Sequence, residues 1–151
     1  MRNKGFTLLE LLIALAIISI VSGGIFLAFR QSPRHNLESA VLQLQADIRY
    51  AQRRAIIEGQ RVDVHIDLME NRYRIRLHGP NGIETIRTIY LQNGVSILQT
   101  NTVRIEFLPR GTPRGESPGT VELINGRYRQ YLTIIPSGGR VRIAEVRIAN
   151  N

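Results

Sequence analysis

An apolar segment close to the N-terminus constrains this chain more than any other feature. Arg2 and Lys4 precede it, and the residues from Phe6 to Phe29 contain a single charged side chain, Glu10. A helix of these 24 residues would be about 36 Å long, which exceeds the roughly 30 Å hydrocarbon core of a bilayer. Because basic flanking residues stay in the cytoplasm, we expect a single-pass membrane helix with the C-terminal domain outside.

Glu10 is the exceptional residue of this segment. A carboxylate inside a membrane helix costs at least a few kcal/mol, so it marks a functional hypothesis. In one interpretation the side chain is protonated or snorkels to the helix end. In another, the chain is cut after Gly5, and the new ammonium on Phe6 lies one helical turn from the carboxylate. In a bundle of parallel, staggered helices, Glu10 of one subunit would then neutralise the ammonium of the next and set the axial register.

The run from Lys4 to Glu10, Lys-Gly-Phe-Thr-Leu-Leu-Glu, followed by about twenty apolar residues, resembles the N-terminus of type IV pilins and type II secretion pseudopilins. The resemblance implies that residues 1–5 are a prepilin leader peptide and that residues 6–29 are the transmembrane and filament-core helix. It implies that a prepilin peptidase cuts between Gly5 and Phe6 and methylates the Phe6 amine. The implied location is the inner membrane, with lipid as the first partner and other pilin subunits as partners in the filament.

Two features disfavour an ordinary secretory signal peptide. The apolar run is too long for a typical signal segment, and no small-x-small cleavage site follows it between Phe26 and Arg34. The segment also departs from many major pilins, because it has Gly23-Gly24 and no proline before Pro33. A glycine pair still weakens or bends a helix at a modest cost.

Residues 30–59 are predicted to form an amphipathic helix that continues the N-terminal helix into a long spine. Ser32-Pro33 is suited to a helix start, since proline is tolerated at the first helical position. Gly59 is suited to the C-terminal cap. Apolar residues recur at spacings of three and four, which places one apolar stripe on the helix. The stripe consists of Leu37, Val41, Leu44, Ile48, Ala51 and Ala55.

Residues 60–151 change to a period of two with frequent turn signals, which is typical of β-strands. A hairpin turning at Glu70-Asn71 would place Asp67 opposite Arg74, and in that register His65 would face Arg76 and Asp63 would face His78. The fold class is therefore α+β, with a long N-terminal helix packed on an antiparallel β-sheet ectodomain, as in pilins. The expected strands cover residues 62–68, 73–77, 85–90, 95–98, 103–107, 120–124, 130–135 and 140–148.

Three shorter motifs narrow the resemblance to the GspH/FimT branch of minor pseudopilins and minor pilins. They are Gln52-Arg53-Arg54-Ala55 in the amphipathic helix, Phe-Leu-Pro-Arg-Gly at 107–111, and Pro-Ser-Gly-Gly-Arg-Val-Arg at 136–142. The branch resemblance covers nearly the whole chain and assigns residues 60–151 to a GspH/FimT-like ectodomain.

The formal net charge of +8 at pH 7 raises the question of an anionic partner. Nucleic acid and a phospholipid surface are candidates, and the alternative is that the arginines pair with nearby carboxylates. If residues 136–139 join two antiparallel strands with Ile135 opposite Arg140, one face is apolar and the other is basic. The apolar face carries Leu132, Ile134, Val141 and Ile143, and the basic face carries Arg127, Arg129, Tyr131, Thr133, Arg140 and Arg142.

Such a surface is suited to the phosphate backbone of DNA, with salt-sensitive and largely sequence-independent binding. Arg140 and Arg142 also match a motif of the branch, whose FimT-like members resemble DNA-uptake pilins. A solvated edge and a contact surface for other filament subunits are the alternatives.

The sequence carries no signature of an enzyme, a cofactor site or a metal site. Cysteine is absent, and His35, His65 and His78 have no third ligand at a metal-like spacing. No nucleophile elbow or phosphate-binding loop is present. The leading hypothesis is a minor pseudopilin or minor pilin, a structural subunit at or near the tip of a type II secretion pseudopilus or type IV pilus. The second hypothesis is a DNA-binding minor pilin for DNA uptake, and a membrane-anchored enzyme is a distant third.

Overall fold

The computed structural model describes residues 8–28, 32–115 and 119–149. The chain divides into two units, Met1–Ser32 and Pro33–Asn151. The first unit contains helix α1 (Leu8–Ala28), and its residues 8–19 are exposed. Within the described residues, no helix has both the length and the apolar character that a membrane crossing requires.

Helix α2 (Pro33–Glu58) opens the second unit. It begins at Pro33, as predicted, because a proline at the first helical position loses no helical hydrogen bond. It ends before Gly59, whose φ of +62° is the left-handed conformation that closes many helices. The predicted apolar stripe is confirmed, since all six of its residues are at most 1% exposed.

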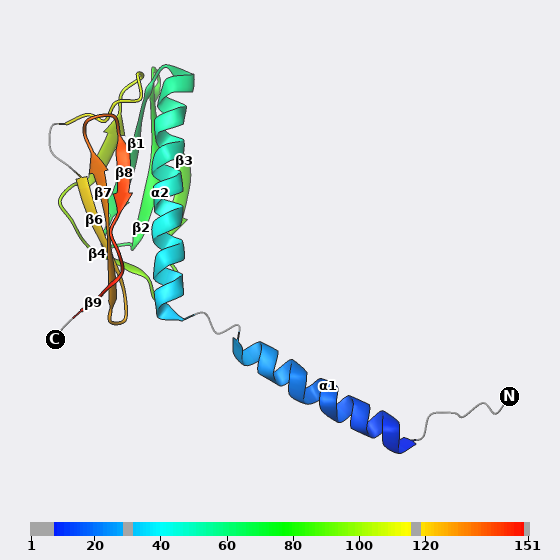
Figure 1. Ribbon diagram of the computed structural model, residues 1–151. Helices are drawn as coiled ribbons and strands as arrows, with labels where there is room; N and C mark the ends of the chain where they lie inside the picture. The colour runs from blue at the N-terminus through cyan, green and yellow to red at the C-terminus, as the bar shows by residue number, and fades with distance from the viewer. Residues whose placement is uncertain (1–7, 29–31, 116–118, 150–151) are drawn as a thin grey trace. The chain divides into compact units, whose positions relative to one another are not determined.

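Two antiparallel sheets follow α2 (Figure 1). The first sheet has the strand order β3-β2-β1-β5, and the second has the order β4-β6-β7-β8, with β9 also paired to β7. The first sheet consists of β1 (Arg61–Asp67), β2 (Arg72–Gly79), β3 (Gly82–Tyr90) and β5 (Arg104–Phe107). The second consists of β4 (Ser96–Thr100), β6 (Gly119–Asn125), β7 (Tyr128–Ile135), β8 (Arg140–Ile143) and β9 (Arg147–Ile148).

Helix α2 packs on strands of both sheets, β1, β2 and β5 of the first and β6 and β7 of the second (Figure 1). Each sheet turns its alternate apolar residues toward the helix, as the period of two requires. Phe107 and Tyr73 are fully buried in this core, together with the α2 stripe. The α+β class, with a helix packed on antiparallel sheets, is therefore confirmed.

The predicted register of the first hairpin is wrong by two residues. Asp67 pairs with Arg72 rather than Arg74, and Asp63 pairs with Arg76 rather than His78. The reason is the position of the turn, which covers residues 68–71 and is centred between Met69 and Glu70 rather than at Glu70-Asn71. The Asp67 side chain accepts a hydrogen bond from the Glu70 N–H at 3.2 Å, and Asn71 takes a left-handed φ of +47°.

The C-terminal segment also differs from the prediction. Ile135 pairs with Arg140, as expected, and the β7–β8 register is confirmed. The single strand expected at residues 140–148 is instead divided into β8 and β9. Ile143 pairs with Leu132, whereas Arg147 pairs with Arg129, so one extra residue is inserted between the two strands. An inserted residue of this kind reverses which face the following side chains occupy.

Candidate functional site

The predicted processing site lies outside the described residues, since Gly5 and Phe6 belong to residues 1–7. Glu10 lies in the first turn of α1 and is exposed. A carboxylate at this end of a helix is favourable, because the N-terminus carries partial positive charge. The pairing of Glu10 with a neighbouring subunit stays a prediction.

Strands β7, β8 and β9 bring four arginines to one face of the second sheet. Residues that pair directly across antiparallel strands point to the same side. Arg142 is opposite Thr133, and Arg140 is opposite Ile135. Both share the side of β7 that carries Arg129, and Arg147 joins them because it pairs with Arg129. We call this set the basic face: Arg129, Arg140, Arg142 and Arg147.

Arg147 was missed by the sequence prediction for a specific reason. In one continuous strand from residue 140 to residue 148, Arg147 would point to the core side, opposite to Arg140 and Arg142. The residue inserted between β8 and β9 moves it to the outer side. The residues between β8 and β9 are Ala144, Glu145 and Val146. None of them is a typical turn residue, so the sequence gives no sign of the insertion.

Arg127 is set apart from the basic face, contrary to the prediction. It lies in the turn between β6 and β7 rather than on a strand. Its guanidinium lies 5.5 Å from the ring centroid of Tyr128 and donates to the Tyr128 hydroxyl at 3.4 Å. Tyr128 occupies the opposite side of β7 from Arg129, so the structure directs Arg127 away from the other arginines.

A buried carboxylate lies beside one end of the basic face, on the same side of the sheet, because Glu122 pairs with Tyr131 across β6 and β7. Glu122 is 1% exposed, and its Oε1 lies 3.6 Å from an Arg129 nitrogen. Its Oε2 accepts a hydrogen bond of 2.6 Å from Gln99. Hydrogen bonding to Glu122, followed by burial, raises the pKa of Tyr131, so this hydroxyl stays protonated at neutral pH. Glu122 therefore offsets the charge of Arg129, and among the described residues it forms no ion pair with the other three arginines of the face.

Arg140, Arg142 and Arg147 are exposed and form no ion pair with any described residue. The first sheet behaves differently, because its arginines are neutralised within the fold. Asp63 is fully buried and contacts Arg76, Arg104 and His78, and Asp67 contacts Arg72 and Arg74. The alternative that arginines pair with nearby carboxylates is thus correct for the first sheet and incorrect for three residues of the basic face.

The histidines are not arranged as a metal site. His65 pairs across the strands with Arg74 and with Arg104, and His78 contacts Asp63 through Nε2 at 2.8 Å. Burial, followed by the charges of Arg76 and Arg74, lowers the pKa of His65 and keeps it neutral at pH 7. Among the residues that the structure describes, no group of three histidine, aspartate or glutamate side chains is placed to hold a metal ion.

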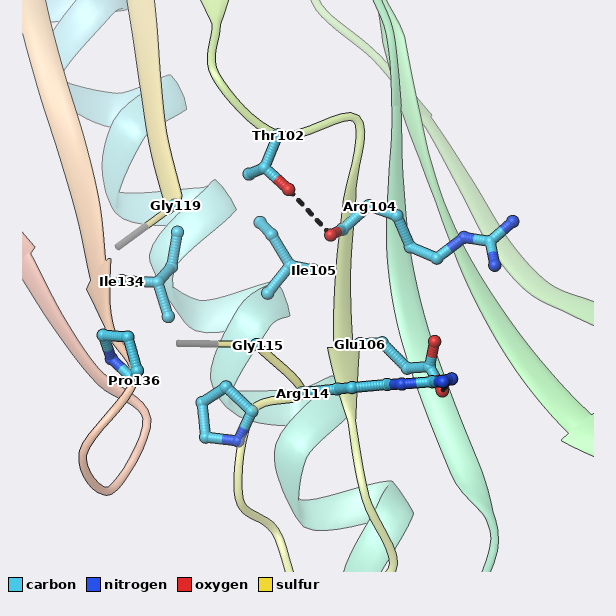
Figure 2. Close-up of a pocket in the computed structure, with 10 residues that line it drawn as sticks. Thr102, Arg104, Ile105, Glu106, Arg114, Gly115, Gly119, Ile134 and Pro136 are labelled. Carbon is cyan, nitrogen blue, oxygen red and sulfur yellow. Dashed lines mark hydrogen bonds and ion pairs between the residues drawn. The ribbon is translucent and has the colours of Figure 1, made fainter. Parts of the chain in front are cut away.

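A small cavity of about 40 Å³ lies where β5 and the following loop meet the second sheet (Figure 2). Ile105 and Ile134 line it, and Arg114 contacts Glu106 at its rim at 3.3 Å. Arg61 contacts the same carboxylate at 3.2 Å. Pockets for small ligands are typically about 300 Å³ or more, so this cavity has room for water and not for a substrate.

Helix α2 packs on two antiparallel sheets, and an apolar segment that carries Glu10 precedes it in the sequence. These two features together are those of a pilin-like protein. Residues 1–26 match the prokaryotic N-terminal methylation motif, and residues 40–140 match the family described as type II transport protein GspH. The second match covers most of the chain, and the chain belongs to the GspH family.

Sequence and structure comparisons agree with this assignment. The type II secretion system protein H of Klebsiella pneumoniae is 35% identical over 69 residues, which are 44% of this chain and 41% of that relative. The alignment thus spans less than half of the relative's length.

Two solved structures share the fold. The minor pseudopilin EpsH from the type 2 secretion system of Vibrio cholerae has a TM-score of 0.61 at 14% identity, covering 72% of this chain and 96% of EpsH. The type IV minor pilin FimU of Pseudomonas aeruginosa has a TM-score of 0.61 at 17% identity, covering 74% of this chain and 90% of FimU. The chain's family is described as a type II transport protein, which supports the prediction that the chain is not an enzyme.

Proposed function

We propose that this protein is a minor pseudopilin or minor pilin, a structural subunit at or near the tip of a type II secretion pseudopilus or type IV pilus. The observation that carries the proposal is the presence in one chain of the methylation motif at residues 1–26 and the GspH family at residues 40–140. The methylation motif is suited to filament assembly, and the GspH segment supplies the ectodomain of the subunit.

In this proposal the prepilin peptidase removes residues 1–5 and methylates the amine of Phe6. Before assembly, residues 6–29 hold the protein in the inner membrane with the ectodomain outside. During assembly the helix leaves the lipid and packs among the helices of other subunits. Glu10 then pairs with the Phe6 ammonium of a neighbour, which fixes the axial position of each new subunit.

The replacement Glu10→Ala tests this assignment. We expect membrane insertion to be unchanged and incorporation into filaments to fall at least about tenfold, because a buried ammonium without a partner costs several kcal/mol. The measurement is the amount of the protein in sheared filaments relative to the membrane fraction. Glu84→Ala is the matched control, since Glu84 is exposed on β3 and has no ion pair among the described residues. Normal incorporation of the Glu10 variant would contradict the register mechanism.

A second function, DNA capture, is favoured by one specific observation: among the residues that the structure describes, Arg140, Arg142 and Arg147 have no ion-pair partner. From Arg129 to Ile135 the strand extends about 20 Å, which equals the rise of roughly six base pairs. Unpaired arginines spaced along this length are suited to successive phosphates. In this proposal the filament presents the basic face to DNA, and binding is insensitive to base sequence.

The double replacement of Arg140 and Arg142 by alanine tests DNA capture. If both contact phosphates, the salt dependence of duplex binding should lose about 1.8 from the slope of log K against log salt, and affinity should fall at least about tenfold. Fluorescence anisotropy at several salt concentrations measures both quantities. The control removes Arg34 and Arg54, which also lowers the charge by two but takes arginines already paired with Glu38 and Glu58. No binding by the unmodified protein, or equal losses in both double variants, would exclude the basic face as a DNA site.

A further inference from the structure

Helix α2 presents two glutamines to the hairpin that carries Arg140 and Arg142. Gln45 donates from Nε2 to the carbonyl oxygen of Val141 at 3.4 Å. Gln52 donates from Nε2 to the carbonyl oxygens of Gly111 at 2.8 Å and Gly138 at 3.5 Å. The two glutamines are seven residues apart, which is two helical turns, so they lie on the same side of the helix.

Strand β8 is the outer strand of the second sheet, next to β7. The outer strand of a sheet has carbonyl groups that no neighbouring strand can satisfy, and such edges need cover. Val141 and Gly138 have their carbonyl oxygens satisfied by side chains of α2 instead. The segment between these two residues contains Arg140, and Arg142 follows directly, so both arginines lie on backbone that the helix holds.

The approach of the helix to the hairpin depends on glycine. Gly139 is buried, has a φ of +66°, and closes the turn by donating its N–H to the Ile135 carbonyl at 3.1 Å. A Cβ atom at this position would lie 2.7 Å from the Gln52 Nε2. The left-handed backbone favours glycine here, and a side chain at this position would displace the Gln52 amide from where it meets the hairpin.

Gly111 shows the same requirement on the other side of Gln52. Its φ is +79°, and a Cβ atom there would lie 2.6 Å from the Ile56 Cδ1. The three motifs that stand out in the sequence therefore meet at one side chain. Gln52 belongs to the first, Gly111 to the second and Gly139 to the third, which gives their co-occurrence a physical reason.

We propose that Gln45 and Gln52 are positioning residues that fix the backbone of residues 138–142, so that Arg140 and Arg142 are preorganised for a DNA phosphate backbone. This inference rests on the DNA-capture proposal for its partner. A fixed backbone avoids the entropy loss of ordering the hairpin at the moment of binding. The glutamines themselves contact no phosphate, since their amides are engaged with the hairpin and the Gly111 loop.

The test uses the full chain in detergent micelles and the double replacement of Gln45 and Gln52 by alanine. Amide hydrogen exchange at residues 139–142 should accelerate about tenfold or more, because their anchors are removed. Affinity for a duplex oligonucleotide should fall about fivefold while the salt slope stays unchanged, since no phosphate contact is deleted. Arg140→Ala should behave differently and reduce the slope by about 0.9. Gln43→Ala is the matched control, because Gln43 is an exposed glutamine of the same helix that forms no hydrogen bond with the hairpin in the described part of the chain.

Gln52→Glu separates the hydrogen bond from the volume of the side chain. Glutamate keeps the length but lacks the donor, so the exchange at residues 139–142 should accelerate as it does in the alanine variant. Unchanged exchange in both variants would overturn the positioning role, whatever the DNA result. Faster exchange together with control-like affinity would overturn the link to DNA. If the unmodified protein binds no DNA, the DNA-capture proposal itself fails, and the exchange data still decide whether the glutamines hold the hairpin.

Discussion

Replacing Asp47 with alanine should lower the free energy of unfolding by about 3 kcal/mol, because it breaks the polar contact between α2 and the first sheet. Asp47 is 5% exposed and accepts a 2.7 Å hydrogen bond from the fully buried Tyr73 hydroxyl. Its other oxygen accepts from Arg87 at 2.9 Å. Burial, followed by the bond to Asp47, raises the pKa of Tyr73, so the hydroxyl remains a donor throughout the physiological range.

The cost arises from the groups that Asp47 leaves behind. The Tyr73 hydroxyl would stay buried without an acceptor, which alone costs about 1–3 kcal/mol. Arg87 is half-exposed and lies 4.9 Å from the Tyr50 ring centroid, so it loses less. Tyr73→Phe should cost only about 1 kcal/mol, since the carboxylate keeps Arg87, and the double variant should show strong coupling between the two sites.

Urea unfolding followed by circular dichroism measures these free energies. Glu38→Ala is the matched control on the same helix, because its pair with Arg34 is exposed and should contribute at most about 0.5 kcal/mol. If Asp47→Ala were no more destabilising than Glu38→Ala, the buried contact would have no role in holding the helix to the sheet.

Asp47 also shows what the sequence could and could not predict. The period of the apolar stripe predicted correctly which side of α2 is buried, since a helix can direct only one stripe into a core. Asp47 lies between Leu44 and Ile48 on that same side, and its position was the signal for a buried carboxylate. Its partner could not be predicted, because Tyr73 and Arg87 lie on other elements and their approach depends on tertiary packing.

The sheets illustrate a second limit. The alternation of residues predicted which side chains share a face, and the two-residue error in the β1–β2 register left those faces correct. An even shift keeps every side chain on its side and changes only its cross-strand partner. The insertion before Arg147 is an odd shift, and it moved that residue to the other face. The prediction of which face a side chain occupies therefore fails only where an inserted residue interrupts the two-residue period of the strand.

The charge of the protein illustrates a third limit. Composition gives an excess of arginine, and it does not reveal which arginines have partners. Asp63 and Asp67 pair with arginines of the first sheet, whereas Arg140, Arg142 and Arg147 of the second sheet form no ion pair with any described residue. Acidic residues near in space can be far in sequence, as with Arg104 and Asp63. Unpaired arginines are therefore a property of the fold, and they are the reason to consider an anionic partner.

Replacing Asp63 with asparagine should destabilise the protein by about 3–5 kcal/mol, the largest effect expected from a single polar substitution here. Asp63 is fully buried on the outer side of β1. Arg76 donates to both of its oxygens, at 3.2 and 2.5 Å, and His78 contacts one of them at 2.8 Å. Asparagine keeps the shape of the side chain, so the change isolates the loss of the negative charge.

The size of the effect follows from what surrounds the carboxylate. The side chains of Arg76 and His78 are only 14% and 11% exposed, so water cannot replace the lost partner. Arg104, whose Nε lies 3.4 Å from Asp63, is 48% exposed and should relax into solvent. Most of the loss of stability therefore comes from Arg76, a poorly solvated cation that would lose the negative charge of Asp63.

Thermal and urea unfolding of the full chain in detergent measure the loss, with Glu84→Gln as a control that changes the charge equally at an exposed position of β3. The control should stay within about 0.5 kcal/mol of the unmodified protein. Arg76→Met combined with Asp63→Leu provides the complementary test. Removing both charges should recover much of the stability, because the penalty comes from the unpaired cation rather than from the missing attraction. If the double variant were as unstable as Asp63→Asn, the stability of this face of the sheet would depend on side-chain shape and not on charge balance.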